Sequence, residues 1–80
     1  MTVNDAVANR VIRLLQEKKI TQYRLEQNSG IPHGSMDRIL CGQNKTVTFT
    51  TVYKLAKAFD MTLFEFLDDE VFHSEDLEIE

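Results

Sequence analysis

The chain has 80 residues and a formal net charge of −4, a size that allows one domain at most. It has no apolar run long enough to span a membrane and no basic-then-apolar signal segment, so we expect a cytoplasmic protein. The chain has one cysteine, Cys41, so it cannot form an internal disulfide. This cysteine and the two histidines are not spaced as a set of metal ligands. We therefore expect no metal or other cofactor, and a fold stabilised by packing.

The charge is unevenly distributed along the chain. Up to Lys57 there are nine Lys and Arg and four acids, a net charge of +5; from Ala58 onward there are nine acids and no Lys or Arg. Such asymmetry indicates a basic part that contacts nucleic acid or a membrane, with an acidic tail attached. A chance variation of surface charge is the alternative.

The first predicted helix covers about residues 4–18. Its apolar side chains recur at the spacing of one helix face, at Val7, Val11, Leu14 and Leu15. Thr2 or Asn4 is suited to accept from the open amides at its N-terminus.

Two short helices follow. Residues 22–29 form the first, after Thr21 as N-cap, and Gly30 ends it because glycine adopts positive φ without steric cost. Residues 33–41 form the second, and Gly42 ends it in the same way. Two short helices joined by a glycine turn make a helix-turn-helix.

The last two predicted helices precede the acidic end of the chain. The β-branched residues 46–52 favour a strand on propensity alone. We prefer a helix that begins near residues 48–50, because apolar side chains follow at helical spacing, at Val52, Leu55, Ala56 and Phe59. Thr62 caps a fifth helix that we expect to direct four side chains into the core: Leu63, Phe64, Phe66 and Leu67. We divide the chain into a domain, 1–69, and an acidic tail, 70–80.

From Thr21 the sequence reads TQYRLEQNSGIPHGSMDRILCGQNK, and TTVYKLAKAFDMTLFEFL follows. Over about residues 7–67 the chain resembles the Cro/repressor-type (XRE-like) helix-turn-helix family of phage repressors and bacterial transcription regulators. The order and spacing of several features carry the likeness: Thr21-Gln22, Leu25, Gly30-Ile31, Ser35-Met36, Gly42, and the segments 55–59 and 63–67. The resemblance implies an all-α, compact five-helix, lambda-repressor-like domain whose third helix enters the major groove of double-stranded DNA.

By the same resemblance, the third helix carries the base-reading residues. Its outward set is His33, Gly34, Ser35, Asp37 and Arg38. Arg38 suits guanine, because a guanidinium donates to O6 and N7 together, which is worth roughly 1–3 kcal/mol of discrimination. Gly34 has two interpretations. Its missing side chain lets the helix backbone approach the groove wall closely, or it is a tolerated variant that only lowers helix propensity.

Phosphate contacts are expected from the start of the second helix and from the loop after the third. This set is Thr21, Gln22, Arg24, Asn44, Lys45 and Thr46. The remaining N-terminal cations are expected on a solvated face: Arg10, Arg13, Lys18 and Lys19. We expect Cys41 to be a small core residue.

Two positions depart from the family pattern. Leu15 and Leu40 stand where many members pair an Arg with a Glu, so an apolar contact is expected to replace a buried ion pair. Glu26 stands where the family usually has a small residue, and its carboxylate needs a partner. The candidates are Arg38, whose base-reading role would then weaken, and the amides at the start of the third helix.

These observations predict a sequence-specific DNA-binding transcription regulator, a repressor that acts as a homodimer. The alternative is a protein-interaction or antitoxin-like module with the same fold, which would use the acidic tail. We expect no enzyme: His33 and His73 stand far apart, Cys41 has no evident base, and there is no glycine-rich phosphate loop.

The acidic tail has three interpretations. It is a flexible solvated extension, as charge runs usually are. Alternatively, Leu77 and Ile79 alternate with acids as in a short edge strand and contact a second copy. In the third interpretation, the acids fold back on the basic face and compete with phosphate.

Overall fold

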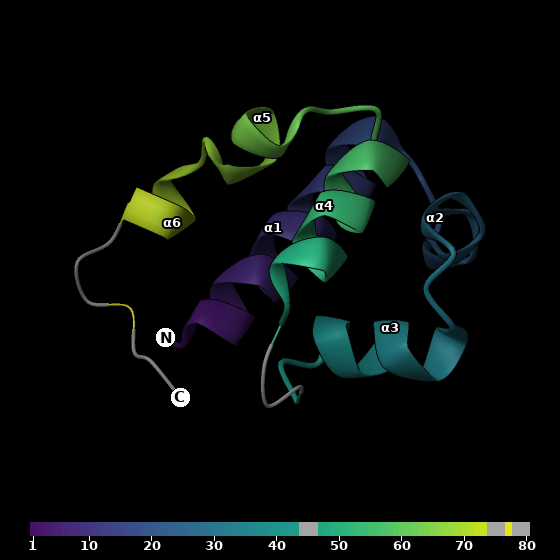
Figure 1. The fold of residues 1–80 in the computed structure, drawn as a ribbon, viewed down its shortest axis with the longest axis horizontal. Helices are drawn as coiled ribbons and strands as arrows, with labels where there is room; N and C mark the ends of the chain where they lie inside the picture. The colour runs from purple at the N-terminus through teal and green to yellow at the C-terminus, as the bar shows by residue number, and fades with distance from the viewer. Residues whose placement is uncertain (44–46, 74–76, 78–80) are drawn as a thin grey trace.

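The computed structural model describes residues 1–43, 47–73 and 77. These residues form helices and no strand (Figure 1). The helices are α1 (Val3–Lys18), α2 (Gln22–Ser29), α3 (His33–Leu40), α4 (Phe49–Ala58), α5 (Leu63–Leu67) and α6 (Glu70–His73). The all-α prediction is confirmed, and α6 adds a helix to the five that the sequence predicted.

Threonine hydroxyls fix where four of the helices begin. In each case the side-chain oxygen accepts from the backbone amide three residues later, at Thr2, Thr21, Thr48 and Thr62. In α1 and α5 an acid also accepts from the amide of the capping threonine and completes a capping box. The cap at Thr48 agrees with the predicted start of α4, and Thr2, not Asn4, caps α1.

Two glycines end the helices of the helix-turn-helix. Gly30 has φ 74° after α2, and Gly42 has φ 69° shortly after α3. Both angles lie in the left-handed region, which disfavours side chains with a Cβ. Ile31, between α2 and α3, is buried and anchors the turn against the core.

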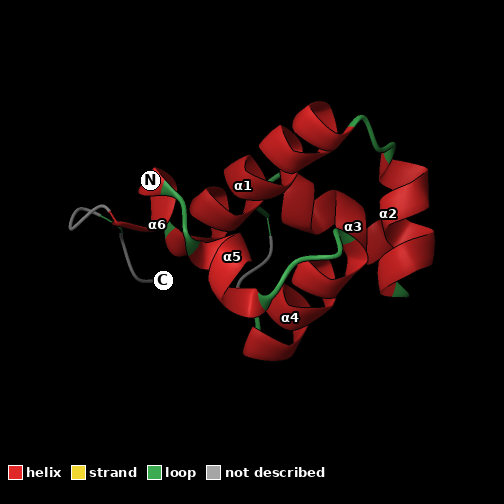
Figure 2. Ribbon diagram, turned by 90° about the horizontal axis from the view of Figure 1, so that it is seen from above, coloured by secondary structure: helices red, strands yellow, loops and turns green. Residues whose placement is uncertain are grey.

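The core lies between α1, α3, α4 and the side chains that α2 and α5 direct inward. Its buried members are Val7, Val11, Leu14, Leu25, Ile31, Met36, Ile39, Val52, Leu55, Ala56, Phe59 and Phe66. Leu15 and Leu40 are half-buried and pack against this cluster. Figures 1 and 2 show α2 and α3 at one end of the molecule and α6 at the other.

Three expectations about burial were wrong. Arg10 is buried, not solvated, because carbonyls of α5 and a carboxylate beyond it accept its N–H groups. Cys41 is exposed, because it caps the outer end of α3 after the inward-facing Leu40. Phe64 is 83% exposed, because the short α5 buries only one face and Phe66 occupies it.

Helix α6 packs against α1. Phe72 of α6 packs against the hydrophobic core, and its ring centroid lies 6.1 Å from that of Phe66. The division of the chain at residue 69 stays a prediction, and the tail interpretations that involve Ile79 and the acids at 75, 76, 78 and 80 lie outside the described residues. Within the described part, no helix is long and apolar enough to cross a membrane.

Candidate nucleic-acid interface

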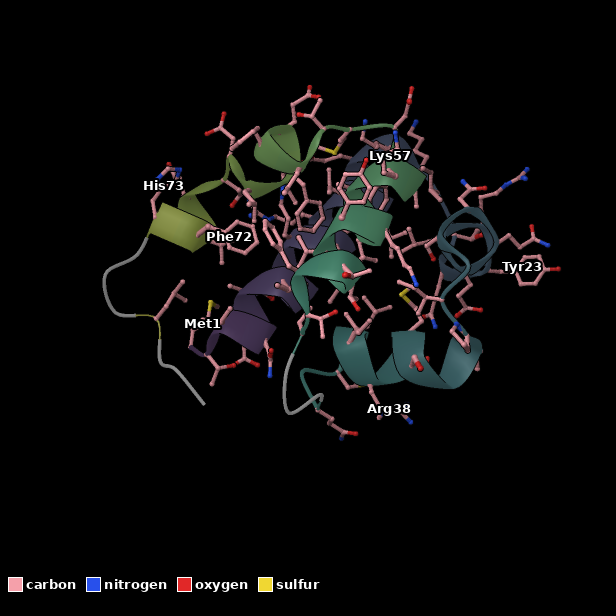
Figure 3. All side chains as sticks on the ribbon, in the orientation of Figure 1. Met1, Tyr23, Arg38, Lys57, Phe72 and His73 are labelled. Atoms are coloured by element: carbon pink, nitrogen blue, oxygen red, sulfur yellow. The ribbon has the colours of Figure 1, made fainter. Side chains whose placement is uncertain are left out.

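The α2–α3 unit presents one face to the core and the other to solvent. Leu25 of α2 and Met36 and Ile39 of α3 are buried, which fixes how α3 is rotated about its axis. Figure 3 shows Arg38 on the outer side of α3, pointing away from α1 and α4. The helix therefore offers a free face of the kind that a major groove accommodates.

The structure brings the predicted base-reading residues together on that face. His33, Gly34, Asp37 and Arg38 are exposed, and Ser35 is half-buried. The Arg38 Nη2 donates to the Ser35 hydroxyl at 3.3 Å. Arg38 has no carboxylate partner among the described residues, so most of its five N–H donors are available to a ligand.

Four polar side chains, which we call the polar ring, connect α2 to the first five residues of α3: Gln22, Glu26, His33 and Asp37. The Gln22 amide Nε2 donates to Glu26 Oε2 at 2.9 Å and to Asp37 Oδ1 at 2.8 Å. The His33 ring completes the connection, with Nδ1 2.8 Å from Glu26 Oε2 and Nε2 3.3 Å from Asp37 Oδ2. Each carboxylate thus contacts both the amide and the imidazole.

Glu26 does not have the partners that the sequence suggested. Within the described chain its carboxylate contacts Gln22 and His33, neither Arg38 nor the α3 amides. The reason is position, since Glu26 lies one turn after Gln22 and faces the residue that begins α3. The spacings of four residues from Gln22 to Glu26 and from His33 to Asp37 are the sequence signal for this ring.

The polar ring shifts the ionisation of two of its members. Hydrogen bonds from Gln22 and then from His33 lower the pKa of Glu26 below its ordinary value. The hydrogen bond to Glu26, followed by the charges of Asp37 and Glu26, raises the pKa of His33 above its ordinary value. Both shifts favour a charged imidazolium between charged carboxylates.

The predicted phosphate-binding residues are only partly described. The Thr21 hydroxyl oxygen accepts the Arg24 amide, and the Gln22 side-chain amide uses both N–H groups within the polar ring. In this arrangement Gln22 can contact a phosphate only through its backbone, which is one of the open amides in the first turn of α2. The Arg24 side chain is exposed. Asn44, Lys45 and Thr46 lie outside the described residues.

Several of the described basic residues lie away from α3. Arg10 and Arg13 both contact Asp69, so part of the acidic end neutralises part of the basic segment. Lys57 lies over the Tyr53 ring, 5.9 Å from its centroid, and Figure 3 places it on the upper side of the molecule, opposite Arg38 on the lower side. The +5 charge of the segment therefore overstates the positive charge beside the helix-turn-helix.

An exposed aromatic patch lies on α4 and α5. The sequence predicted no functional role for its residues. The patch consists of Phe49, 67% exposed, Tyr53, 50% exposed, and Phe64. Phe49 and Tyr53 also line a shallow apolar pocket of about 250 Å³ with Thr50 and Leu63. The helical spacing of residues 49 and 53 is the sequence signal for this surface.

The comparison with protein families agrees with this geometry. Residues 10–71 match the family described as the Cro/C1-type HTH DNA-binding domain. No curated protein and no solved structure matches the chain at a significant level. The family match spans the second half of α1 with the buried Val11 and Leu14, the whole α2–α3 unit, and helices α4 and α5. The chain therefore belongs to the Cro/C1-type helix-turn-helix DNA-binding domain family.

Proposed function

We propose that the protein is a sequence-specific transcription regulator, a repressor, that inserts α3 into the major groove of its operator. The exposed Arg38 guanidinium carries this proposal, because it projects from the free face of a helix that the core holds in place. It has no competing carboxylate among the described residues, so it is available for a bidentate contact with guanine.

The other predicted contact residues fit roles around Arg38. Asp37 is a candidate acceptor for a cytosine amino group, and Ser35 orients the arginine through its hydroxyl. The backbone of Gln22 and the side chain of Arg24 are assigned to phosphates. Lys45 and its neighbours in the loop after α3 are assigned to the opposite groove wall, and no residue is assigned a catalytic role.

Selection of bound duplexes from a random DNA pool, followed by affinity measurement at several salt concentrations, tests the proposal. We expect an enriched sequence containing guanine and an affinity that falls steeply with salt. Arg38→Ala should lower the affinity for this sequence by a factor of about 5–100, in line with roughly 1–3 kcal/mol for a bidentate contact. Arg13→Ala, a cation removed from an exposed site on α1, is the matched control and should bind normally.

Two results would count against this function. Absence of enrichment, with no duplex binding at low salt, would reject DNA as the ligand and favour the protein-interaction or antitoxin-like alternative. Equal losses in Arg38→Ala and Arg13→Ala would leave DNA binding in place but remove α3 as the reading helix.

We further propose that the repressor acts as a homodimer and that the aromatic patch contributes to the contact between the two copies. Exposed aromatic side chains that cluster on one surface are typical of interaction sites. Phe64→Ser is a suitable probe, because this side chain is 83% exposed and its removal leaves the core intact. Sedimentation should show a dimer for the wild type and a monomer for the variant; unchanged dimers would exclude the patch.

A further inference from the structure

The polar ring places two carboxylates beside the face that we assign to DNA. Asp37 has a side chain that is 55% exposed, and Glu26 lies next to it with 12% exposure. A phosphate backbone that approaches this end of α3 meets both charges. Uncompensated, they would oppose binding, since two carboxylates and a phosphate close to a protein surface repel one another.

The cation that compensates them is His33. Its Nδ1 lies 2.8 Å from Glu26 and its Nε2 lies 3.3 Å from Asp37. A neutral imidazole carries one N–H and can donate to only one of these carboxylates, whereas an imidazolium donates to both. An imidazolium therefore suits the ring, because Nδ1 is hydrogen-bonded to Glu26 and Nε2 faces Asp37 at ion-pair distance.

The other cations on these helices do not perform this task. Arg38 donates to Ser35, and the described structure places Arg24 in contact with neither carboxylate of the ring. The charged groups that act on His33 are Glu26 from α2 and Asp37 from α3, and within the described chain α1 and α4 add none. Among the described residues, His33 is the cation that balances the pair.

We propose that His33 is a positioning residue of the DNA interface, which as an imidazolium neutralises Glu26 and Asp37, holds Asp37 in place, and couples DNA affinity to its own protonation. This inference rests on the proposed DNA-binding function. It assigns His33 an indirect role in place of the base contact expected from the sequence. The side chain that faces DNA directly is then Asp37, held by His33 and Gln22.

Proton linkage gives the direction of the effect. The pKa of His33 is already raised by Glu26 and Asp37 in the free protein. A bound polyanion raises it further, because an additional negative charge favours the imidazolium. Affinity then falls as pH increases from the free to the bound pKa, by tenfold for each pKa unit that separates the two.

The test is the affinity for a fluorescent random-sequence duplex of about 30 base pairs at about 50 mM salt, measured between about pH 6 and pH 9. We expect the wild-type affinity to fall by about tenfold across this range. His33→Gln keeps a hydrogen-bonding side chain but cannot be charged, so it should bind at all pH values with the weak affinity of the wild type at high pH. His73→Gln, which removes the exposed histidine of α6, should keep the wild-type profile.

A second variant separates charge from loss of structure. Glu26→Gln combined with His33→Gln removes one carboxylate together with the cation, and should restore much of the affinity lost in His33→Gln without restoring the pH dependence. An NMR titration of the His33 ring should give a pKa above its ordinary value in the free protein and a higher one with the duplex bound.

The outcomes distinguish this inference from the function on which it rests. Binding whose pH profile is the same in the wild type and in His33→Gln would overturn the role of His33 and leave DNA binding intact. A His33 pKa that does not rise on addition of the duplex would also overturn it. Absence of duplex binding at every pH would reject the proposed function itself, and this inference with it.

Discussion

The Arg10 side chain contacts both the backbone carbonyl and the aromatic ring of Phe66. The Arg10 Nε donates to the Phe66 carbonyl at 2.8 Å, and the guanidinium carbon lies 5.8 Å from the ring centroid. Further N–H groups donate to the Glu65 carbonyl at 3.0 Å and to Asp69 at 3.2 Å. Since the last carbonyls of a helix lack intrahelical donors, Arg10 satisfies the end of α5 and attaches it to α1.

Arg10→Met should therefore lower the free energy of unfolding by about 2–4 kcal/mol, because it leaves the buried Phe66 carbonyl without its side-chain donor and removes one of the two arginines that contact Asp69. Urea denaturation measures this loss. Arg13→Met is the matched control, since Arg13 also contacts Asp69 but is 45% exposed and has no bond to the α5 carbonyls. It should cost less than about 1 kcal/mol. Similar small losses in both variants would show that the contacts of Arg10 with α5 contribute little.

Gly42 should tolerate alanine less well than Gly30 does. Both have positive φ, so each Gly→Ala change costs about 1–2 kcal/mol of backbone strain. A Cβ at Gly42 would also lie 2.6 Å from Asp5 Oδ1, whereas one at Gly30 meets nothing within 4 Å. Because the Asp5 carboxylate also accepts from the Thr2 amide, it cannot move without breaking the capping box of α1.

The contact between residues 42 and 5 is measured by a double-mutant cycle. In the Asp5→Ala background the extra cost of Gly42→Ala over Gly30→Ala should disappear, because the crowded carboxylate is absent. Persistence of the extra cost in that background would assign it to the backbone at Gly42 alone.

Asp69 should make the fold sensitive to acid. Burial opposes its ionisation, but the Val71 amide and then Arg13 and Arg10 outweigh this, so its pKa is lowered from 3.8. A carboxyl group with a lowered pKa stabilises the fold above its ordinary pKa, and this contribution disappears as pH falls through the lowered value. Thermal unfolding should therefore show stability falling below about pH 4, and less steeply in Asp69→Asn. Parallel curves for the two proteins would exclude Asp69 as a source of this dependence.

The sequence predicted the helices well where local chemistry determines their limits. Residues 22–29 form α2 as predicted, because a threonine cap and a glycine of positive φ mark its two ends. The choice of a helix over a strand near residue 50 was correct because apolar side chains at helical spacing outweigh β-branched propensity there. The short α6 was missed, since Phe72 packs on Phe66 through a tertiary contact that no local pattern encodes.

The sequence predicted which face of α3 is exposed, but not which side chains are bonded to one another on and beside it. The exposed face of α3 follows from the spacing of its apolar residues, which is why Arg38 was correctly placed outward. The sequence did not predict the partners of Glu26 and Arg10, because these partners depend on how the helices cross. Gln22 and Asp37 are 15 residues apart, and Arg10 and Phe66 are 56 apart, separations over which single-sequence periodicity carries no information.

Gly34→Ala should separate stability from DNA affinity. Gly34 lies in α3 and a Cβ there would meet nothing within 4 Å, so alanine should stabilise the helix by about 0.5–1 kcal/mol. If the groove wall approaches the backbone at this point, as in the first of the two interpretations of Gly34, the added methyl occupies the space of a sugar or a thymine methyl, and affinity falls with an unchanged salt slope. Asn28→Ala, an exposed α2 position outside the proposed contact set, controls for added helix propensity and should bind normally. Affinity in Gly34→Ala equal to that of the wild type would make Gly34 a tolerated helix residue with no part in recognition.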